Sequence, residues 1–192
     1  NQDSVVSLWV TSDTFSQPRK LIEFDNRNRQ ARISLQKVVG DKVYFYVEEE
    51  SKGYNTLWVT DGTIAGTKLL LDVDPGNNGS NWPRLMDAID SVLYFSTPDV
   101  KHGYELWRSD GTVSGTYMVK DIMPGPMGST LSNIFEVSDN RLYFAALDSN
   151  GMELWTSDGT EDGTNALVDI FEGEASGLHV YAELIVVGDS IF

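Results

Sequence analysis

The sequence predicts an all-β fold, a β-propeller built from four-stranded antiparallel blades, and three observations lead to this prediction. First, a stretch that reads ELWRSDGTVSGT at residues 105–116 recurs, and the tryptophans of its copies lie 58−9=49, 107−58=49 and 155−107=48 residues apart. Self-similarity of this length indicates a repeat architecture. Second, each period contains four short strand-forming runs separated by turn signals, and third, no segment keeps a helical period. Four strands in a repeating unit of this length favour a propeller over a sandwich.

The first full repeat shows how each strand is assigned. Residues 33–39 have a period-two pattern, and residues 43–47, VYFYV, are the β-branched and aromatic types that suit a half-buried strand. Residues 57–59 carry a Leu-Trp pair, residues 61–67 turn the chain, and residues 68–73 return it. In chain order the expected strands are 7–10, 21–24, 33–39, 43–47, 57–59, 68–73, 88–89, 92–96, 105–108, 117–122, 134–137, 141–147, 153–156, 166–170, 184–187 and 191–192.

The strand pattern divides the chain into repeats of a single propeller, or of part of one. We expect a partial blade at 1–32, full blades at 33–82, 83–131 and 132–180, and a partial blade at 181–192 that pairs with 1–32 if the ring closes. The chain stops within an expected strand, so we favour a piece of a larger propeller over a closed four-bladed ring. Links rich in Gly, Pro, Ser and Asn connect the blades.

A turn motif, Asp-Gly-Thr-x-x-Gly-Thr, follows each Leu-Trp pair in the full repeats. An Asp side chain accepts hydrogen bonds from backbone N–H groups just after it, glycine adopts positive φ without steric cost, and Thr hydroxyls bind nearby backbone. The motif therefore predicts a self-supporting hairpin, and calcium binding by its Asp residues is the alternative. The residues concerned are Asp61, Gly62, Thr63, Gly66 and Thr67; Asp110, Gly111, Thr112, Gly115 and Thr116; and Asp158, Gly159, Thr160, Gly163 and Thr164.

The repeated tryptophans are expected to pack between blades. Neighbouring side chains of a strand point to opposite faces, so the Leu and the Trp of each pair would face different neighbours. A ring of sugar-stacking platforms is the alternative. The residues are Trp9, Trp58, Trp107 and Trp155.

Charge and composition exclude several classes of function. The chain has 29 acidic and 14 basic residues and a net charge of −15, which repels phosphate backbones and anionic lipids, so we expect no nucleic-acid partner. No apolar run approaches the length of a membrane helix, so no membrane insertion is expected. The absence of cysteine excludes disulfides and thiolate chemistry.

Few residues suggest chemistry. The oxygen-rich sequence after the fourth strand of the first repeat makes Asp72, Asp74 and Asn77 weak candidates for calcium, against a Pro-Gly turn with Asx caps. His102 and His179 are the only histidines, and both are expected to be exposed or bound locally. We assign no catalytic residue and no cofactor, with calcium left open.

The copies at 105–125 and 153–173 resemble the bacterial ELWxxDGT repeat family, and the resemblance extends over nearly the whole chain. It weakens at Thr56, which replaces Glu, and at residues 11–18, which lack the glycines. The resemblance implies an extracellular or cell-surface setting and further repeats of the same parent chain as neighbours. It supplies no catalytic residues.

Together these observations predict a non-enzymatic binding or scaffolding module of a secreted or surface protein, whose partner is a protein or a glycan. A carbohydrate-active enzyme with a site at the central channel is one alternative. A structural spacer in a large adhesin or filament is the other.

Overall fold

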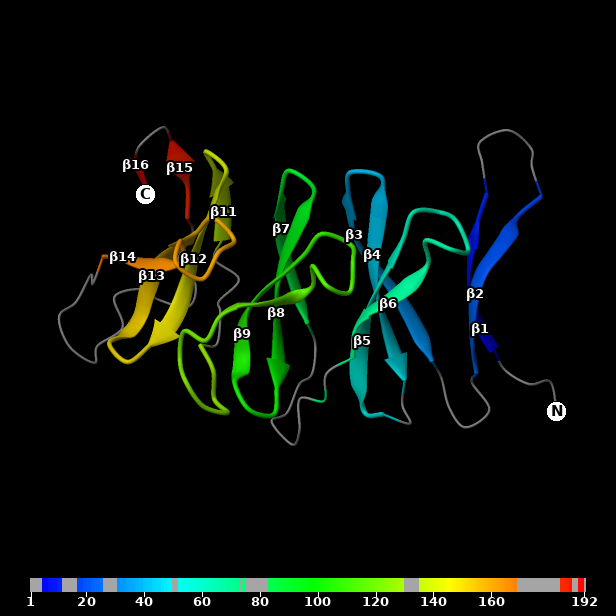
Figure 1. The fold of residues 1–192 in the computed structure, drawn as a ribbon, viewed down its shortest axis with the longest axis horizontal. Helices are drawn as coiled ribbons and strands as arrows, with labels where there is room; N and C mark the ends of the chain where they lie inside the picture. The colour runs from blue at the N-terminus through cyan, green and yellow to red at the C-terminus, as the bar shows by residue number, and fades with distance from the viewer. Residues whose placement is uncertain are drawn as a thin grey trace. The chain divides into compact units, whose positions relative to one another are not determined.

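All regular secondary structure in the described part of the chain is β-strand (Figure 1). The structure is a computed structural model that describes residues 5–11, 17–25, 31–49, 52–72, 74, 83–129, 135–168, 184–187 and 190–191. Strands pair antiparallel with their neighbours in the sequence, so each sheet is a simple up-and-down meander. The predicted all-β class is confirmed.

In the described ranges, three sheets have four strands each and two shorter sheets have two strands each. The first sheet is β3 (Arg32–Val39), β4 (Lys42–Glu49), β5 (Tyr54–Thr60) and β6 (Lys68–Leu71); the second is β7 (Arg84–Ile89), β8 (Val92–Asp99), β9 (Gly103–Ser109) and β10 (Tyr117–Lys120); the third is β11 (Phe135–Ser138), β12 (Arg141–Asp148), β13 (Gly151–Ser157) and β14 (Asn165–Val168). The two-stranded sheets are β1 (Val5–Val10) with β2 (Arg19–Asp25), and β15 (Val186–Val187) with β16 (Ser190–Ile191).

The three large sheets share one register. In each, the phenylalanine of the second strand lies directly opposite the tryptophan of the third: Phe45 and Trp58, Phe95 and Trp107, Phe144 and Trp155. Period-two alternation therefore gives corresponding residues the same face in every sheet. The repeat seen in the sequence is a repeat of strand pairing as well.

Short turns between the first and second strands fix this register. Gly40, Asp90, Asp139 and Asn140 have positive φ angles of 60°, 54°, 47° and 60°. Two-residue hairpins with positive φ match the right-handed twist of the strands, and Gly, Asp and Asn are the residues that adopt it most readily. The turns lie between the expected first and second strands of each full repeat.

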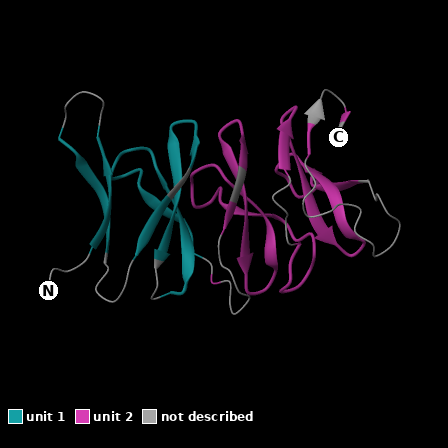
Figure 2. Ribbon diagram, turned by 180° about the vertical axis from the view of Figure 1, so that it is seen from behind, with its two compact units in different colours: residues 1–73 teal, residues 74–192 magenta. Residues whose placement is uncertain are grey.

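The chain forms two compact units, residues 1–73 and 74–192, coloured separately in Figure 2. In the first unit, Phe24 of β2 meets Trp58 of β5 edge to face, with ring centroids 5.1 Å apart. Phe45 stacks on the same tryptophan at 6.2 Å, and Val47 and Ala31 complete the cluster. Aromatic pairs of this kind add to the free energy gained by burying apolar area.

The core of the second unit lies between the second and third sheets. Residues from the second sheet and the segment after it pack against residues of β12 and β13; the cluster consists of Ile89, Tyr94, Leu106, Val119, Ile122, Leu142, Phe144, Ala146 and Trp155. Burying a side chain of this size stabilises the fold by about 1.5–3 kcal/mol. The second and third sheets are therefore held together by apolar packing between their faces.

Candidate functional site

The Asp-Gly-Thr hairpins that join the third and fourth strands are the most strongly repeated feature of the structure. In the second sheet, Oδ1 of Asp110 accepts hydrogen bonds from the backbone N–H and the hydroxyl of Thr112, at 2.8 and 2.7 Å. Thr112 Oγ1 in turn accepts from the Gly115 amide at 2.9 Å, and the Thr116 hydroxyl donates to the Thr112 carbonyl at 2.6 Å. The turn is thus closed by its own polar groups.

A hydroxyl residue before the Asp completes each hairpin. Ser109 Oγ accepts the Gly111 N–H at 3.1 Å and lies 2.7 Å from Thr116 Oγ1. The same bonds recur around Asp61 and Asp158 with distances that differ by at most 0.1 Å. Sequence analysis missed this hydroxyl, although a Ser or Thr precedes the Asp in all three copies.

The two glycines of the motif are required for different reasons. Gly62, Gly111 and Gly159 have φ angles of 82°, 85° and 86°, the left-handed region that favours glycine. The second glycine of each hairpin is required by crowding, because a Cβ on Gly115 would lie 2.1 Å from Asp110 Oδ1. Sequence analysis attributed both glycines to positive φ, and that reason applies to the first one.

The Asp carboxylates of the three hairpins accept hydrogen bonds from groups of their own turns. The hydrogen bond from the Thr112 hydroxyl lowers the pKa of Asp110, and the Thr63 and Thr160 hydroxyls lower the pKa of Asp61 and Asp158 in the same way. Within the described ranges no group of three or more His, Cys, Asp or Glu side chains has an arrangement that could hold a metal ion. These bonds explain the motif without the calcium alternative.

Basic side chains contact the hairpin of the adjacent sheet within each unit. Arg19 of β2 donates to the Gly62 carbonyl at 2.7 Å, and Arg108 of β9 donates to the Gly159 carbonyl at 3.3 Å. Lys120 of β10 donates to the Thr164 carbonyl at 2.7 Å. A cation on a third or fourth strand therefore binds the carbonyls of the next Asp-Gly-Thr hairpin.

The tryptophans have different environments. Trp58 packs against Phe24 of the neighbouring sheet, and Trp155 belongs to the cluster between the second and third sheets. Trp107 is buried and stacks on Phe95 at 6.4 Å. Trp107 and Trp155 are buried, each 8% exposed, and Trp58 is partly buried, so these rings pack mainly against other side chains.

Trp9 was expected to pack between sheets like the others, but it is 55% exposed. Its strand β1 pairs with β2 in a two-stranded sheet, and the residue opposite Trp9 is Lys20, where the larger sheets have a phenylalanine opposite the tryptophan. The ring contacts the ammonium group of Lys20, which lies 5.9 Å from its centroid.

Glu105, the first residue of the ELW motif, is the polar residue whose role sequence analysis missed. It is fully buried, with 0% of its surface exposed. Its carboxylate accepts the backbone N–H groups of Ile122 and Met123, at 3.0 and 3.1 Å, and that of Ser129 at 3.0 Å. The available signal was a Glu repeated at the start of a Leu-Trp strand, at 105 and 153.

In the first sheet Thr56 takes the place of this Glu, and its hydroxyl oxygen accepts the indole N–H of Trp58 at 2.9 Å.

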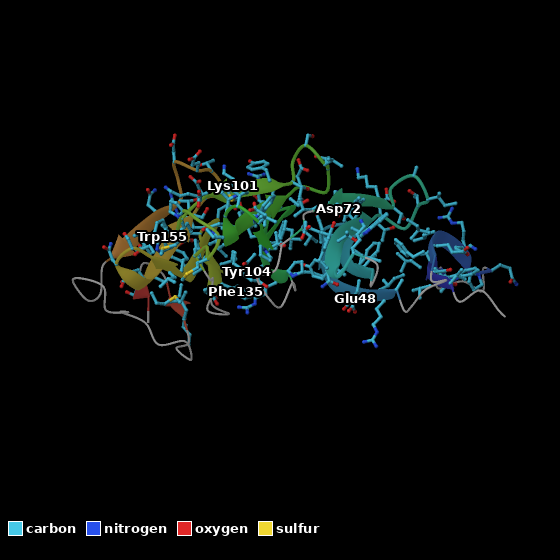
Figure 3. The ribbon with its side chains drawn as sticks, turned by 90° about the horizontal axis from the view of Figure 1, so that it is seen from below. Glu48, Asp72, Lys101, Tyr104, Phe135 and Trp155 are labelled. Atoms are coloured by element: carbon cyan, nitrogen blue, oxygen red, sulfur yellow. The ribbon has the colours of Figure 1, made fainter. Side chains whose placement is uncertain are left out.

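The calcium candidates are not brought together in the described residues. The ammonium group of Lys52, 2.7 Å away, lowers the pKa of Asp72, which is labelled in Figure 3. Asn77 lies outside the described residues. Asp74 is described, and no metal cluster includes it.

His102 is bound locally, in the turn after β8. Its Nδ1 lies 2.7 Å from Asp99 Oδ2, while Asp99 Oδ1 accepts the amides of Lys101 and His102 at 2.7 and 2.6 Å. Burial raises the pKa of Asp99, but the hydrogen bonds from His102 and Lys101 outweigh it and the net shift is downward. His179 lies outside the described residues.

The described residues contain no helix that is long and apolar enough to cross a membrane.

No protein-family profile matches the chain, and no curated protein matches it. Among solved structures it is similar to a mutant puromycin hydrolase complexed with PGG, at 14% identity and a TM-score of 0.47 over 84% of this chain and 24% of that one. It is also similar to an acylaminoacyl peptidase from Pyrococcus horikoshii, at 15% identity and a TM-score of 0.45 over 85% of this chain and 22% of the peptidase. The chain thus spans about a quarter of the length of these hydrolases. Similarity at this level does not transfer an activity.

Proposed function

We propose that the chain is a β-propeller repeat module that serves as a non-enzymatic scaffold for binding a protein or a glycan at the surface of a bacterial cell or in a secreted protein. The propeller is supported by three four-stranded antiparallel sheets that follow one another in the chain with the same residue positions and the same register. The cellular setting rests on the ELWxxDGT resemblance alone.

One observation supports the binding role. The Asp, Gly and Thr residues form the same frame in every hairpin, whereas the two residues at the tip of each hairpin differ. The Asp, Gly and Thr residues of the motif are held by the same hydrogen bonds in all three copies. The two residues between them differ: Ile-Ala in the first hairpin, Val-Ser in the second and Glu-Asp in the third. Ile64 and Val113 are 60% and 62% exposed. Exposed loops on a rigid frame are where binding functions concentrate.

The acidic and basic residues of the motif have structural partners. Asp110 binds its own turn, Glu105 binds backbone amides, and Arg108 binds the Gly159 carbonyl. Polar groups that are already engaged in this way hold a fold in place, which is the role a scaffold requires.

The test is a binding screen followed by tip substitution. The purified chain is applied to a glycan array and to immobilised extracellular proteins, and the best ligand is titrated against Ile64→Ala, Val113→Ala and the Glu161→Ala/Asp162→Ala double variant. We expect at least one of the three to weaken binding tenfold or more, which is about 1.4 kcal/mol. Val38→Ala, an exposed residue on β3, is the matched control and should bind as the unaltered chain does.

An activity assay runs beside the screen. Chromogenic peptide and glycoside substrates should not be turned over above background. Turnover that one acidic substitution abolishes would overturn the non-enzymatic proposal and favour the alternative of a propeller enzyme.

A further inference from the structure

The segment Ile122–Ser129, here called the crossover segment, follows β10 and lies against the beginning of β9. The Ser129 amide donates to the Tyr104 carbonyl at 2.8 Å, and the Ser129 hydroxyl donates to the same carbonyl at 2.9 Å. Gly128 forms a parallel bridge with Tyr104, which Figure 3 labels in the second sheet. A Cβ on Gly128 would lie 2.3 Å from the Tyr104 amide nitrogen. The segment therefore makes direct backbone contact with β9.

The crossover segment also connects the second sheet to the third. The Ser129 carbonyl accepts the amide of Leu147, near the end of β12, at 2.7 Å. One residue thus bonds to β9 through its amide and to β12 through its carbonyl. Movement of the crossover segment would loosen the contact between these two sheets.

Glu105 is the side chain that holds both ends of the crossover segment. Its carboxyl group binds the amides of Ile122 and Met123 at one end and of Ser129 at the other. These bonds join residues 17 to 24 positions apart in the sequence. Because the group is buried and no cation of the described residues lies beside it, ionisation carries a desolvation cost that the three amides offset only in part.

The neighbouring charges do not offset the remaining cost. Asp121, the residue before the segment, is negative and raises the pKa of Glu105 further. On β8 the cross-strand partner of Glu105 is the uncharged Thr97. On β10 the ammonium group of Lys120 is directed to carbonyls of the third sheet's hairpin. Burial is the largest effect, and it raises the pKa of Glu105 from 4.5 to about 7.

We propose that Glu105 makes the crossover segment a proton-dependent contact between the second and third sheets: the buried, neutral carboxyl keeps the segment closed on β9, and its ionisation loosens the segment. When the segment opens, water reaches Glu105 and its pKa returns toward 4.5. The closed form then binds the proton more tightly than the open form does, so a rise in pH favours opening. For values of 4.5 and about 7, the opening equilibrium should increase on the order of 70-fold between pH 5 and pH 8.

The experiment is native-state hydrogen exchange of the full chain between pH 5 and pH 8, read at the amides of Ile122, Met123 and Ser129. Each rate is divided by its intrinsic chemical rate, so that the ratio reports opening alone. We expect the opening of all three amides to rise together with pH. Glu105→Gln, which is neutral at every pH, should remove that rise, although the Gln amide is a poorer partner for the Ile122 N–H than an oxygen.

Two further variants complete the test. Asp121→Asn removes the neighbouring negative charge, so the rise in opening between pH 5 and pH 8 should be smaller than in the unaltered chain and should level off at lower pH, a readout that survives even if Glu105→Gln folds poorly. Glu153→Gln changes the corresponding buried residue of the third sheet and should leave the pH response of the crossover segment in place. The proposal is overturned if opening is independent of pH, if it falls as pH rises, or if Glu105→Gln keeps the original response.

Discussion

Gly115 lies directly beneath the carboxylate of Asp110, so close that a Cβ atom on the glycine would lie 2.1 Å from Asp110 Oδ1. The corresponding distances are 2.0 Å for Gly66 beneath Asp61 and 2.0 Å for Gly163 beneath Asp158. The Asp side chain folds back over the turn because it accepts two hydrogen bonds from Thr112. The Asp and the second glycine of the motif therefore depend on each other.

Substitution of Gly115 by Ala should destabilise the fold by about 1–3 kcal/mol, because the methyl group forces the Asp110 carboxylate out of its bonds. Urea unfolding would measure the loss as a shift in midpoint. Val113→Ala, at the exposed tip of the same hairpin, is the matched control and should stay within about 0.5 kcal/mol. In the Asp110→Ala background Gly115→Ala should cost less than it does alone, and strict additivity would contradict the contact.

Gly111→Val tests the other glycine of the motif. The native φ of 85° is costly for a β-branched residue, so the variant should lose about 1 kcal/mol or more. Thermal unfolding would show this as a lower melting temperature. Unlike Gly115→Ala, this cost should persist in the Asp110→Ala background, because it arises from the backbone. An unchanged melting temperature would mean that the turn does not need positive φ at residue 111.

The two arginines that bind hairpin carbonyls should differ in their contribution. Arg108 is partly buried, its guanidinium group contacts the Tyr117 ring at 5.5 Å, and it binds the Gly159 carbonyl, so Arg108→Ala should cost about 1–2 kcal/mol. Arg19 makes its bond to Gly62 at an exposed position, where solvent competes, and Arg19→Ala should cost less than about 0.5 kcal/mol. Urea unfolding of both variants measures the difference. Equal losses would show that the bond to the carbonyl, rather than burial, sets the contribution.

Local patterns in the sequence were sufficient to predict the strands and the hairpins. The Asp-Gly-Thr turn depends on groups within seven residues of one another, such as Ser109 and Thr116. Glu105 could not be understood in this way, since its partners lie up to 24 positions further along. The exposure of Trp9 was not predicted either, because the sequence pattern of a strand does not show which other strands lie beside it. Sequence periodicity predicts local structure, while long-range contacts decide what a buried polar residue does.

The stabilising effect of the hairpin carboxylates should disappear in acid. The Thr112 hydroxyl lowers the pKa of Asp110 in the folded chain below its ordinary 3.8, so the folded state releases this proton more readily than the unfolded state. The resulting stability is present above pH 3.8 and is lost as the pH falls through the lowered value.

Asp110→Asn keeps an oxygen acceptor but lacks the charge. The difference in unfolding free energy between the unaltered chain and Asp110→Asn should therefore be largest near pH 6 and should shrink as the pH falls below 3.8. Asp162→Asn, at a hairpin tip outside the motif frame, serves as the control. A difference for Asp110→Asn that does not change between pH 6 and pH 2.5 would show that the carboxylate acts through shape alone.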